Sequence, residues 1–130
     1  MEAEPKKILI IDDDSFLLDM YALKFSQHNF SVSTALGSES ALEKLRNGLS
    51  PEIILLDIMM PEMNGFEFLT KMREENMALN AVVIFLSNRG QSSDITQIES
   101  FGVSGYIVKA SSTPSEVIDK VINIINKIKK

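Results

Sequence analysis

Four short apolar runs of this sequence each end at a residue that can do chemistry. The runs cover residues 8–11, 53–56, 81–86 and 106–108. The residues that follow them are Asp12, Asp13 and Asp14, then Asp57, Ser87 and Lys109. In an open parallel sheet the carboxyl ends of the strands line one edge, and ligands bind in the crevice there. If the runs are such strands, the side chains that follow them form one acidic cup for a divalent cation, with a lysine to offset added negative charge.

The segments between these runs have helical periodicity, which predicts strands and helices in alternation around a parallel sheet. A further strand is predicted over residues 30–35, where apolar and polar residues alternate imperfectly. We therefore expect five strands and five helices, with right-handed crossovers placing helices on both faces of the sheet. The length of 130 residues predicts a single domain, residues 1–130, with its core at about residues 6–126.

Spacing and capping residues predict which segments are helical and where the helices begin. In the first helix, one set of residues recurs at three- and four-residue steps: Phe16, Leu17, Met20, Leu23 and Lys24. Ser38 is a candidate cap for the second helix. Capping-box pairs, Asn64 with Glu67 and Thr113 with Glu116, mark the starts of the third and fifth helices.

Composition excludes several classes of protein. The formal net charge of −5 argues against nucleic acid as a partner. No run approaches the ~20 apolar residues that span a bilayer, and the apolar run before Asp12 is too short for a signal peptide. The absence of cysteine suits a reducing compartment. We expect a cytoplasmic protein with no membrane contact.

The segment after the third predicted strand is the most specific motif. It reads DIMMPEMNG over residues 57–65, with Asp57 four residues before Pro61 and eight before Gly65. Together with the acidic pair, the hydroxyl of Ser87, and an aromatic residue three positions before Lys109, it resembles the receiver domains of two-component response regulators. The resemblance covers about residues 6–126. It implies a flavodoxin-like, doubly wound five-stranded parallel sheet of order 2-1-3-4-5, with five helices on both faces.

The resemblance also implies roles for the cup residues. Asp57 would be the phosphoacceptor, and Asp13 and Asp57 would supply carboxylates to Mg²⁺ or Mn²⁺, together with the backbone carbonyl of Met59. Asp12 would act through a metal-bound water or from behind the direct ligands. Oxygen ligands of this kind are those that Mg²⁺ prefers, and Lys109 would neutralise the added phosphoryl charge.

Two further residues would carry the signal outward. Ser87 would meet the phosphoryl oxygens, and Tyr106 would then change rotamer, as the family's aromatic residue does. The output would be a population shift on the surface of the fourth helix, fifth strand and fifth helix. The same surface would serve a downstream protein partner or a weak dimer of an otherwise monomeric protein.

The sequence departs from the family at two places. Asn88 stands where a small residue usually leaves room for the phosphodonor, and Ala110 follows Lys109 where the family commonly has a proline after a cis bond. A cis bond before a non-proline residue costs about 3–4 kcal/mol, so we expect a trans bond here. Met59 and Arg89 are predicted to screen the site from water and to lengthen the phosphorylated lifetime.

The leading interpretation is a signalling phosphoacceptor, not an enzyme in the usual sense, that takes its phosphoryl group from a sensor histidine kinase or a phosphotransfer protein. An alternative is a pseudo-receiver, a constitutive interaction domain that is not phosphorylated. A phosphatase of the haloacid dehalogenase type needs a second aspartate two residues after the nucleophile. Position 59 is methionine, which disfavours that class.

Overall fold

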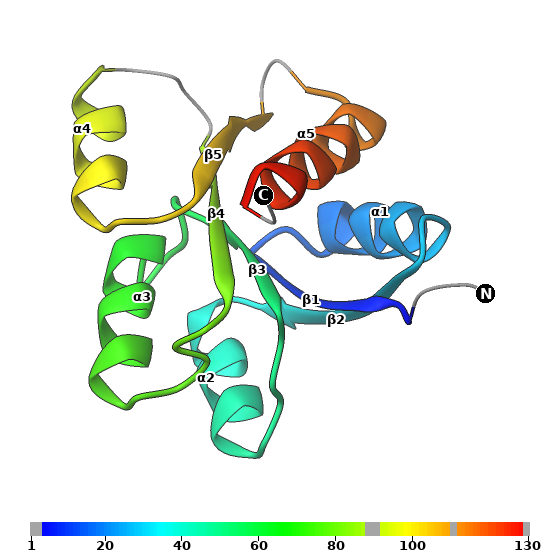
Figure 1. Cartoon of the computed structure of the whole chain (residues 1–130). Helices are drawn as coiled ribbons and strands as arrows, with labels where there is room; N and C mark the ends of the chain where they lie inside the picture. The colour runs from blue at the N-terminus through cyan, green and yellow to red at the C-terminus, as the bar shows by residue number, and fades with distance from the viewer. Residues whose placement is uncertain (1–3, 88–91, 110–111, 129–130) are drawn as a thin grey trace.

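The computed structural model describes residues 4–87, 92–109 and 112–128. Strands and helices alternate along the described chain (Figure 1). The strands are β1 (Lys6–Asp12), β2 (Phe30–Leu36), β3 (Ile53–Asp57), β4 (Val82–Ser87) and β5 (Gly105–Val108). The helices are α1 (Ser15–Ser26), α2 (Ser38–Arg46), α3 (Gly65–Glu74), α4 (Ser92–Ser100) and α5 (Pro114–Ile128). The predicted alternation of five strands and five helices is confirmed in this part of the chain.

All five strands form one parallel sheet of order β2-β1-β3-β4-β5. The predicted flavodoxin-like order is therefore confirmed. Because every strand runs in the same direction, the carboxyl ends of all five meet at one edge. β2 lies on one side of β1 and β3 lies on the other, so the strand order changes direction at β1. This reversal leaves the ends of β1 and β3 side by side at that edge.

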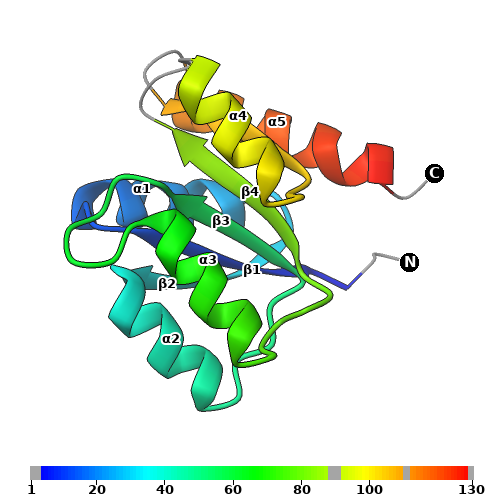
Figure 2. The same ribbon diagram turned by 90° about the vertical axis from the view of Figure 1, so that its left-hand side faces the viewer.

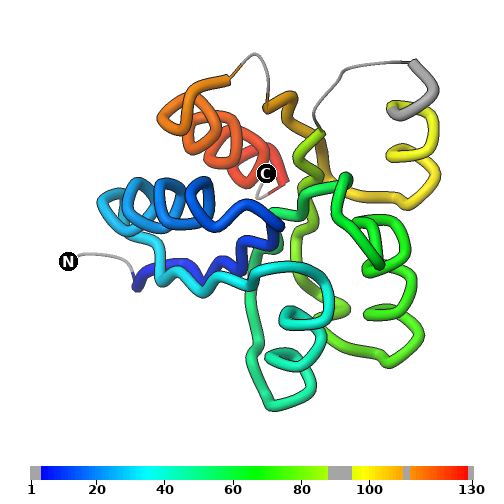
Figure 3. The backbone as a smooth tube through the Cα atoms, turned by 180° about the vertical axis from the view of Figure 1, so that it is seen from behind, coloured from blue at the N-terminus to red at the C-terminus, as the bar shows by residue number. Residues whose placement is uncertain are grey.

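The helices cover both faces of the sheet. Figure 2 looks onto the face covered by α2, α3 and α4, and Figure 3 shows α1 and α5 together on the other side. Alternate residues of β1 supply the two cores: Ile8 and Ile10 pack with α1 and α5, and Leu9 and Ile11 pack with α2 and α3. Strands buried on both faces explain why the runs are continuously apolar.

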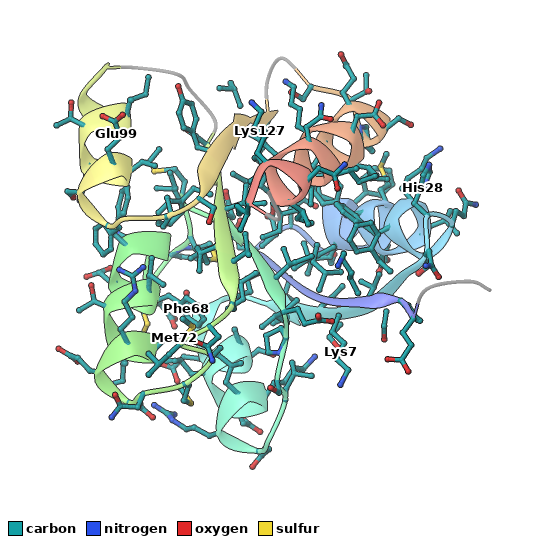
Figure 4. All side chains as sticks on the ribbon, in the orientation of Figure 1. Lys7, His28, Phe68, Met72, Glu99 and Lys127 are labelled. Carbon is teal, nitrogen blue, oxygen red and sulfur yellow. The ribbon has the colours of Figure 1, made fainter. Side chains whose placement is uncertain are left out.

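Side chains from α3 fill the core on their own side of the sheet. Phe68 and Met72, labelled in Figure 4, are both fully buried in this layer. None of the helices in the described part of the chain is long and apolar enough to cross a membrane.

The helix predicted after β1 is confirmed, but the residues that mark its helical period are not the ones that it buries. The buried residues are Leu18, Tyr21 and Phe25, whereas Phe16 and Leu23 are 70% and 61% exposed. Apolar residues surround this helix on most sides, so spacing alone allows two competing faces. The face with the two aromatic rings is the one that packs onto the sheet.

Two of the predicted caps are confirmed and one is wrong. Asn64 and Glu67 form a reciprocal capping box, as do Thr113 and Glu116. Ser38, however, is the first helical residue of α2 and makes no capping bond. Its hydroxyl donates instead to the backbone carbonyl of Met63, in the β3–α3 loop, at 2.9 Å. This hydrogen bond links the first residue of α2 to the β3–α3 loop.

Candidate functional site

Three carboxylates meet at the carboxyl ends of β1 and β3. Ile11 pairs with Leu56 in the sheet, so the next residues, Asp12 and Asp57, end neighbouring strands. One carboxylate oxygen from each of Asp12, Asp13 and Asp57 lies within 4.8 Å of the other two. Asp12 and Asp57 are 0% and 1% exposed, and Asp13 is exposed. We call these three residues the acidic cup: two of its acids are buried and the third opens to solvent.

Lys109 reaches the acidic cup from the end of β5, on the other side of β4. Its Nζ lies 2.8 Å from Asp12 Oδ2 and 3.3 Å from Asp57 Oδ1. The lysine is separated from these acids by 97 and 52 positions in the sequence. The ends of β1, β3 and β5 therefore meet at one place, as the sequence predicts.

The Asp12 carboxylate is held from two directions. The backbone N–H of Asp14 donates to its Oδ1 at 3.0 Å, and Lys109 donates to its Oδ2. Asp14 itself caps α1, accepting from the N–H groups of Phe16 and Leu17. The third aspartate of the run is thus a helix cap that anchors the loop behind the cup.

The acidic cup has more acidic groups than basic ones. Burial, followed by the charge of Asp12, raises the pKa of Asp57 to about 7, with Lys109 acting in the opposite direction. Burial alone would lower the pKa of Lys109, but its hydrogen bond to Asp12 and the charges of Asp57 and Asp12 together raise it. One ammonium therefore faces three acids. An added cation would relieve their repulsion.

The loop after Asp57 leaves no room for a side chain at Gly65. A Cβ built there would lie 2.5 Å from the backbone oxygen of Asp57 and 3.0 Å from the Cα of Ile58. The Gly65 N–H donates to the Ile58 carbonyl at 2.9 Å, and the Ile58 N–H donates to Leu86 in β4 at 3.1 Å. This close approach fixes the backbone of the acid at the centre of the cup.

The comparison with protein families agrees with this geometry. The family model of the response regulator receiver domain matches residues 8–122. The chain belongs to this family. The receiver domain of this chain places the acidic pair, the central aspartate and the lysine of the motif at one edge of its sheet.

Known proteins resemble this receiver domain over nearly all of its length. Response regulator SaeR of Staphylococcus aureus is 29% identical over 123 residues, which cover 95% of this chain and 52% of SaeR. The chain thus spans about half the length of the curated relatives it matches. A solved structure of the Francisella response regulator 1452 receiver domain is 26% identical, with a TM-score of 0.80, over 95% of this chain and 98% of that one. Chemotaxis protein CheY4 of Vibrio cholerae, 22% identical with a TM-score of 0.83 over 92% and 98% of the two chains, shares the fold.

The other predicted residues of the described chain lie on β4, on β5 and in the β3–α3 loop. Ser87 is buried at the end of β4 and pairs with Val108, the residue before Lys109. Tyr106 lies on β5 and is partly exposed, and the side chain of Met59 is 65% exposed. The roles given to these residues remain predictions.

Two of the predicted tuning residues, Asn88 and Arg89, lie outside the described residues, as does the peptide bond between Lys109 and Ala110. The expectation of a trans bond there stays a prediction.

The donors of the acidic cup fit a hard divalent cation. All three are carboxylates, and their oxygens lie close enough together to share one ion. Mg²⁺ is commonly held by one or two carboxylates, with water and phosphate oxygens completing its shell. Asp12, Asp13 and Asp57 are the residues that could hold such a cation, and the choice of Asp13 and Asp57 as direct ligands stays a prediction.

One residue near the cup was missed by the sequence analysis. Tyr21 of α1 is buried, and the charges of Lys109, Asp12, Asp57 and Asp14 all act on its phenol. The residues that indicated the helical period of α1 did not include it. Its spacing from Leu18 and Phe25 could have indicated the alternative face.

Proposed function

We propose that this receiver domain accepts a phosphoryl group on the carboxylate of Asp57 from a phosphohistidine of a sensor histidine kinase or a phosphotransfer protein. The observation that supports the proposal is the buried Asp57 carboxylate, which lies beside both the Lys109 ammonium and the acidic pair. Buried charges add little to stability unless they are well compensated. An arrangement with excess negative charge suits chemistry in which a cation and a transferred group complete the site.

The transfer would proceed by in-line attack. An Oδ of Asp57 forms a bond to phosphorus as the bond from phosphorus to the donor's imidazole nitrogen breaks, and that nitrogen takes up a proton from solvent. The product is an acyl phosphate with more negative charge than the carboxylate. The ammonium of Lys109, 3.3 Å from Asp57 Oδ1, is placed to neutralise part of this charge.

A divalent cation at the cup would supply the rest of the neutralisation. It would also favour the ionised form of Asp57, which is the nucleophile, because the pKa of this acid is raised to about 7 by burial first and by Asp12 second. We therefore propose that phosphorylation requires Mg²⁺ or Mn²⁺.

The exposed side of α1 offers a surface for the protein donor. Phe16, Met20 and Leu23 are spaced four and three residues apart, so they share one face of the helix. Phe16 and Leu23 are exposed and Met20 is half-buried. Contiguous exposed apolar residues mark sites of protein contact. Because α1 begins beside the cup, a donor packed on this face would lie next to Asp57.

The response to phosphorylation would travel through β4 and β5. Ser87 would donate its hydroxyl to the phosphoryl group, and Tyr106 would turn inward from its partly exposed position. A downstream protein, or a second copy in a weak dimer, would then bind the face of α4, β5 and α5. We propose this as a cytoplasmic signalling module whose work is binding and not turnover of a substrate.

The lifetime of the phosphorylated form would depend on the residues beside Asp57 and Ser87. Met59 lies two residues past the acceptor, and its side chain stands at the surface, where it could limit the approach of water. Truncating Met59 or Arg89 to alanine should speed loss of the phosphoryl group, and unchanged dephosphorylation rates would reject this role.

The test is incubation with Mg²⁺ and phosphoramidate, followed by the intact mass of the protein. The wild-type chain should gain the mass of one phosphoryl group, and Asp57→Asn should gain none. Omission of Mg²⁺ should prevent the gain. An unmodified wild-type chain under these conditions would favour the pseudo-receiver, in which the same fold binds partners without phosphorylation.

A further inference from the structure

A groove opens beside the acidic cup, on the face of the sheet that α2 and α3 cover (Figure 2). It has a volume of about 270 Å³ and lies between the start of α2 and the β3–α3 loop. Asp13 lines the groove and is also a member of the cup. A group that fills the groove therefore lies next to a group that approaches Asp57.

Hydrogen bonds hold both walls of the groove in place. The hydroxyl of Ser38 in α2 donates to the carbonyl of Met63 at 2.9 Å and joins the two walls. The Gly37 N–H donates at 2.9 Å to the carbonyl of the last residue of β1. Glu62 has a φ of 69°, in a γ-turn that the Met63 N–H and the Pro61 carbonyl close at 2.7 Å. Because its walls are already ordered, the groove can bind a partner at little cost in conformational entropy.

The lining of the groove combines apolar surface with acids. Leu36, at the end of β2, is 56% exposed, and Pro61 adds apolar surface from the opposite wall. The carboxylates of Asp13, Glu39 and Glu62 belong to exposed residues of the same lining. No basic residue of the described chain lines the groove. The groove is therefore negatively charged along one part of its lining and apolar along another.

Such a lining suits the side chain of a lysine or an arginine. These side chains lay an aliphatic stem along apolar surface and keep the charged head among polar groups. The cup has Lys109 to offset its acids, whereas the acids of the groove have no such partner in the lining. A metal ion would use the acids and leave Leu36 and Pro61 uncovered. Charge and apolar surface together favour a basic side chain.

We propose that the groove binds a basic side chain of the protein phosphodonor, an inference that rests on the proposed phosphoacceptor function. On a helix, residues three or four positions apart are neighbours, with about 5–6 Å between their Cβ atoms. A lysine or arginine at this spacing from the phosphohistidine enters the groove beside Asp13 while the phosphoryl group lies over Asp57. The donor thus contacts the domain on both sides of the cup, at the groove and at the exposed side of α1. Two contacts orient the donor, and phosphoryl transfer depends on orientation.

The experiment uses synthetic helical peptides as phosphodonors. Each peptide carries one histidine, phosphorylated beforehand with phosphoramidate. The parent peptide has glutamine at the positions three and four residues before and after the histidine, and each of four variants has arginine at one of them. Transfer to the chain in the presence of Mg²⁺ is followed by intact mass. The best arginine peptide should transfer about three- to fivefold faster than the parent, the effect of one exposed ion pair. Added salt should reduce this advantage.

A double variant of the chain, Glu39→Gln with Glu62→Gln, tests the groove itself. It removes two of the charges and keeps the shapes of the side chains. The advantage of the arginine peptide should disappear, and the rate of phosphorylation by phosphoramidate should not change. The control is Glu74→Gln with Glu99→Gln, which makes the same change in net charge at exposed positions of α3 and α4. The control should keep the advantage.

The outcomes separate this inference from the function on which it rests. Arginine peptides no faster than the parent, or an advantage that the groove variant keeps or that the control also loses, would overturn the role of the groove. A wild-type chain that gains no phosphoryl group from phosphoramidate would overturn the function of Asp57 instead.

The groove can then be tested without phosphorylation, by titrating the ¹⁵N-labelled chain with the unphosphorylated peptides. The backbone amides of Gly37 and Met63 should shift further with the best arginine peptide than with the parent. Equal shifts would overturn the inference. Shifts of these amides with protein concentration alone would assign the groove to a second copy of the chain and overturn it as well.

Discussion

The buried carboxylate of Asp57 should make the cation-free fold less stable as pH rises. Burial first, and the charge of Asp12 second, raise its pKa from the usual 3.8 to about 7. Between these values the folded state keeps a proton that the unfolded state has lost. The free energy of unfolding therefore falls as pH increases through this window. Each tenfold difference in proton affinity corresponds to about 1.4 kcal/mol, so the whole effect is about 4 kcal/mol, of which about 3 kcal/mol lies between pH 5 and pH 8.

Urea denaturation at pH 5 and pH 8, with a chelator present, measures this effect in the wild-type chain and in Asp57→Asn. Asparagine keeps the shape of the side chain but does not ionise, and all other groups titrate in both proteins. Between pH 5 and pH 8 the wild-type chain should lose about 3 kcal/mol more than the variant. Parallel changes in the two proteins would refute the reasoning that burial holds the proton on Asp57.

Adding Mg²⁺ at pH 8 extends the same experiment. A ligand present at 100 times its dissociation constant should stabilise the folded wild-type chain by about 2.7 kcal/mol. Asp57→Asn should gain much less, because a carboxylate ligand is gone. Equal stabilisation of the two proteins would place the ion somewhere other than the acidic cup.

Two further predictions concern the backbone of the site and the donor surface. Gly65→Ala should lower stability by about 1–3 kcal/mol and slow phosphorylation, because its Cβ meets backbone atoms. In Gly105→Ala the added Cβ would meet only side-chain atoms of Ile124, the nearest being the terminal Cδ1 at 2.8 Å, so the change should cost less than about 1 kcal/mol. Equal shifts in thermal denaturation would contradict this contrast. Replacing Phe16 and Leu23 together by alanine should slow transfer from a phosphotransfer protein about tenfold or more and leave phosphorylation by phosphoramidate unchanged. Equal slowing with both donors would argue against docking on α1.

The sheet and the main members of the site could be predicted because the sequence encodes them locally. A run of apolar residues long enough for one strand, followed directly by an acid, a hydroxyl or a lysine, specifies both the strand and the residue at its carboxyl end. Parallel topology then brings those ends together. Asp12, Asp57 and Lys109 lie at one edge for this reason, although 97 positions separate the first from the last.

The inward side of α1 could not be predicted by spacing. Its twelve residues include apolar side chains in nearly every direction, so the pattern fits either Phe16 with Leu23 or Leu18 with Phe25. The choice depends on how the helix packs on the sheet and against α5, which is a tertiary property. The burial of Tyr21 follows from that choice and was missed with it.

The steric role of Gly65 is another feature that only the folded chain reveals. The motif identifies the glycine, but the reason for it is the contact with the backbone oxygen of Asp57, eight residues earlier. Ser38 is similar: its type predicts a helix cap, whereas in the fold its hydroxyl bonds to the β3–α3 loop. Contacts between loops are set by packing and leave little trace in local sequence.

The location of the phosphoryl group decides whether Asp57 is the phosphoacceptor. After phosphorylation by phosphoramidate with Mg²⁺, borohydride reduces an acyl phosphate of aspartate to homoserine, and peptide mass mapping then finds the modified residue. We expect homoserine at position 57 in the wild-type chain and at no position in Lys109→Ala treated for the same short time. Modification at another aspartate, or full modification of position 57 without the lysine, would contradict it.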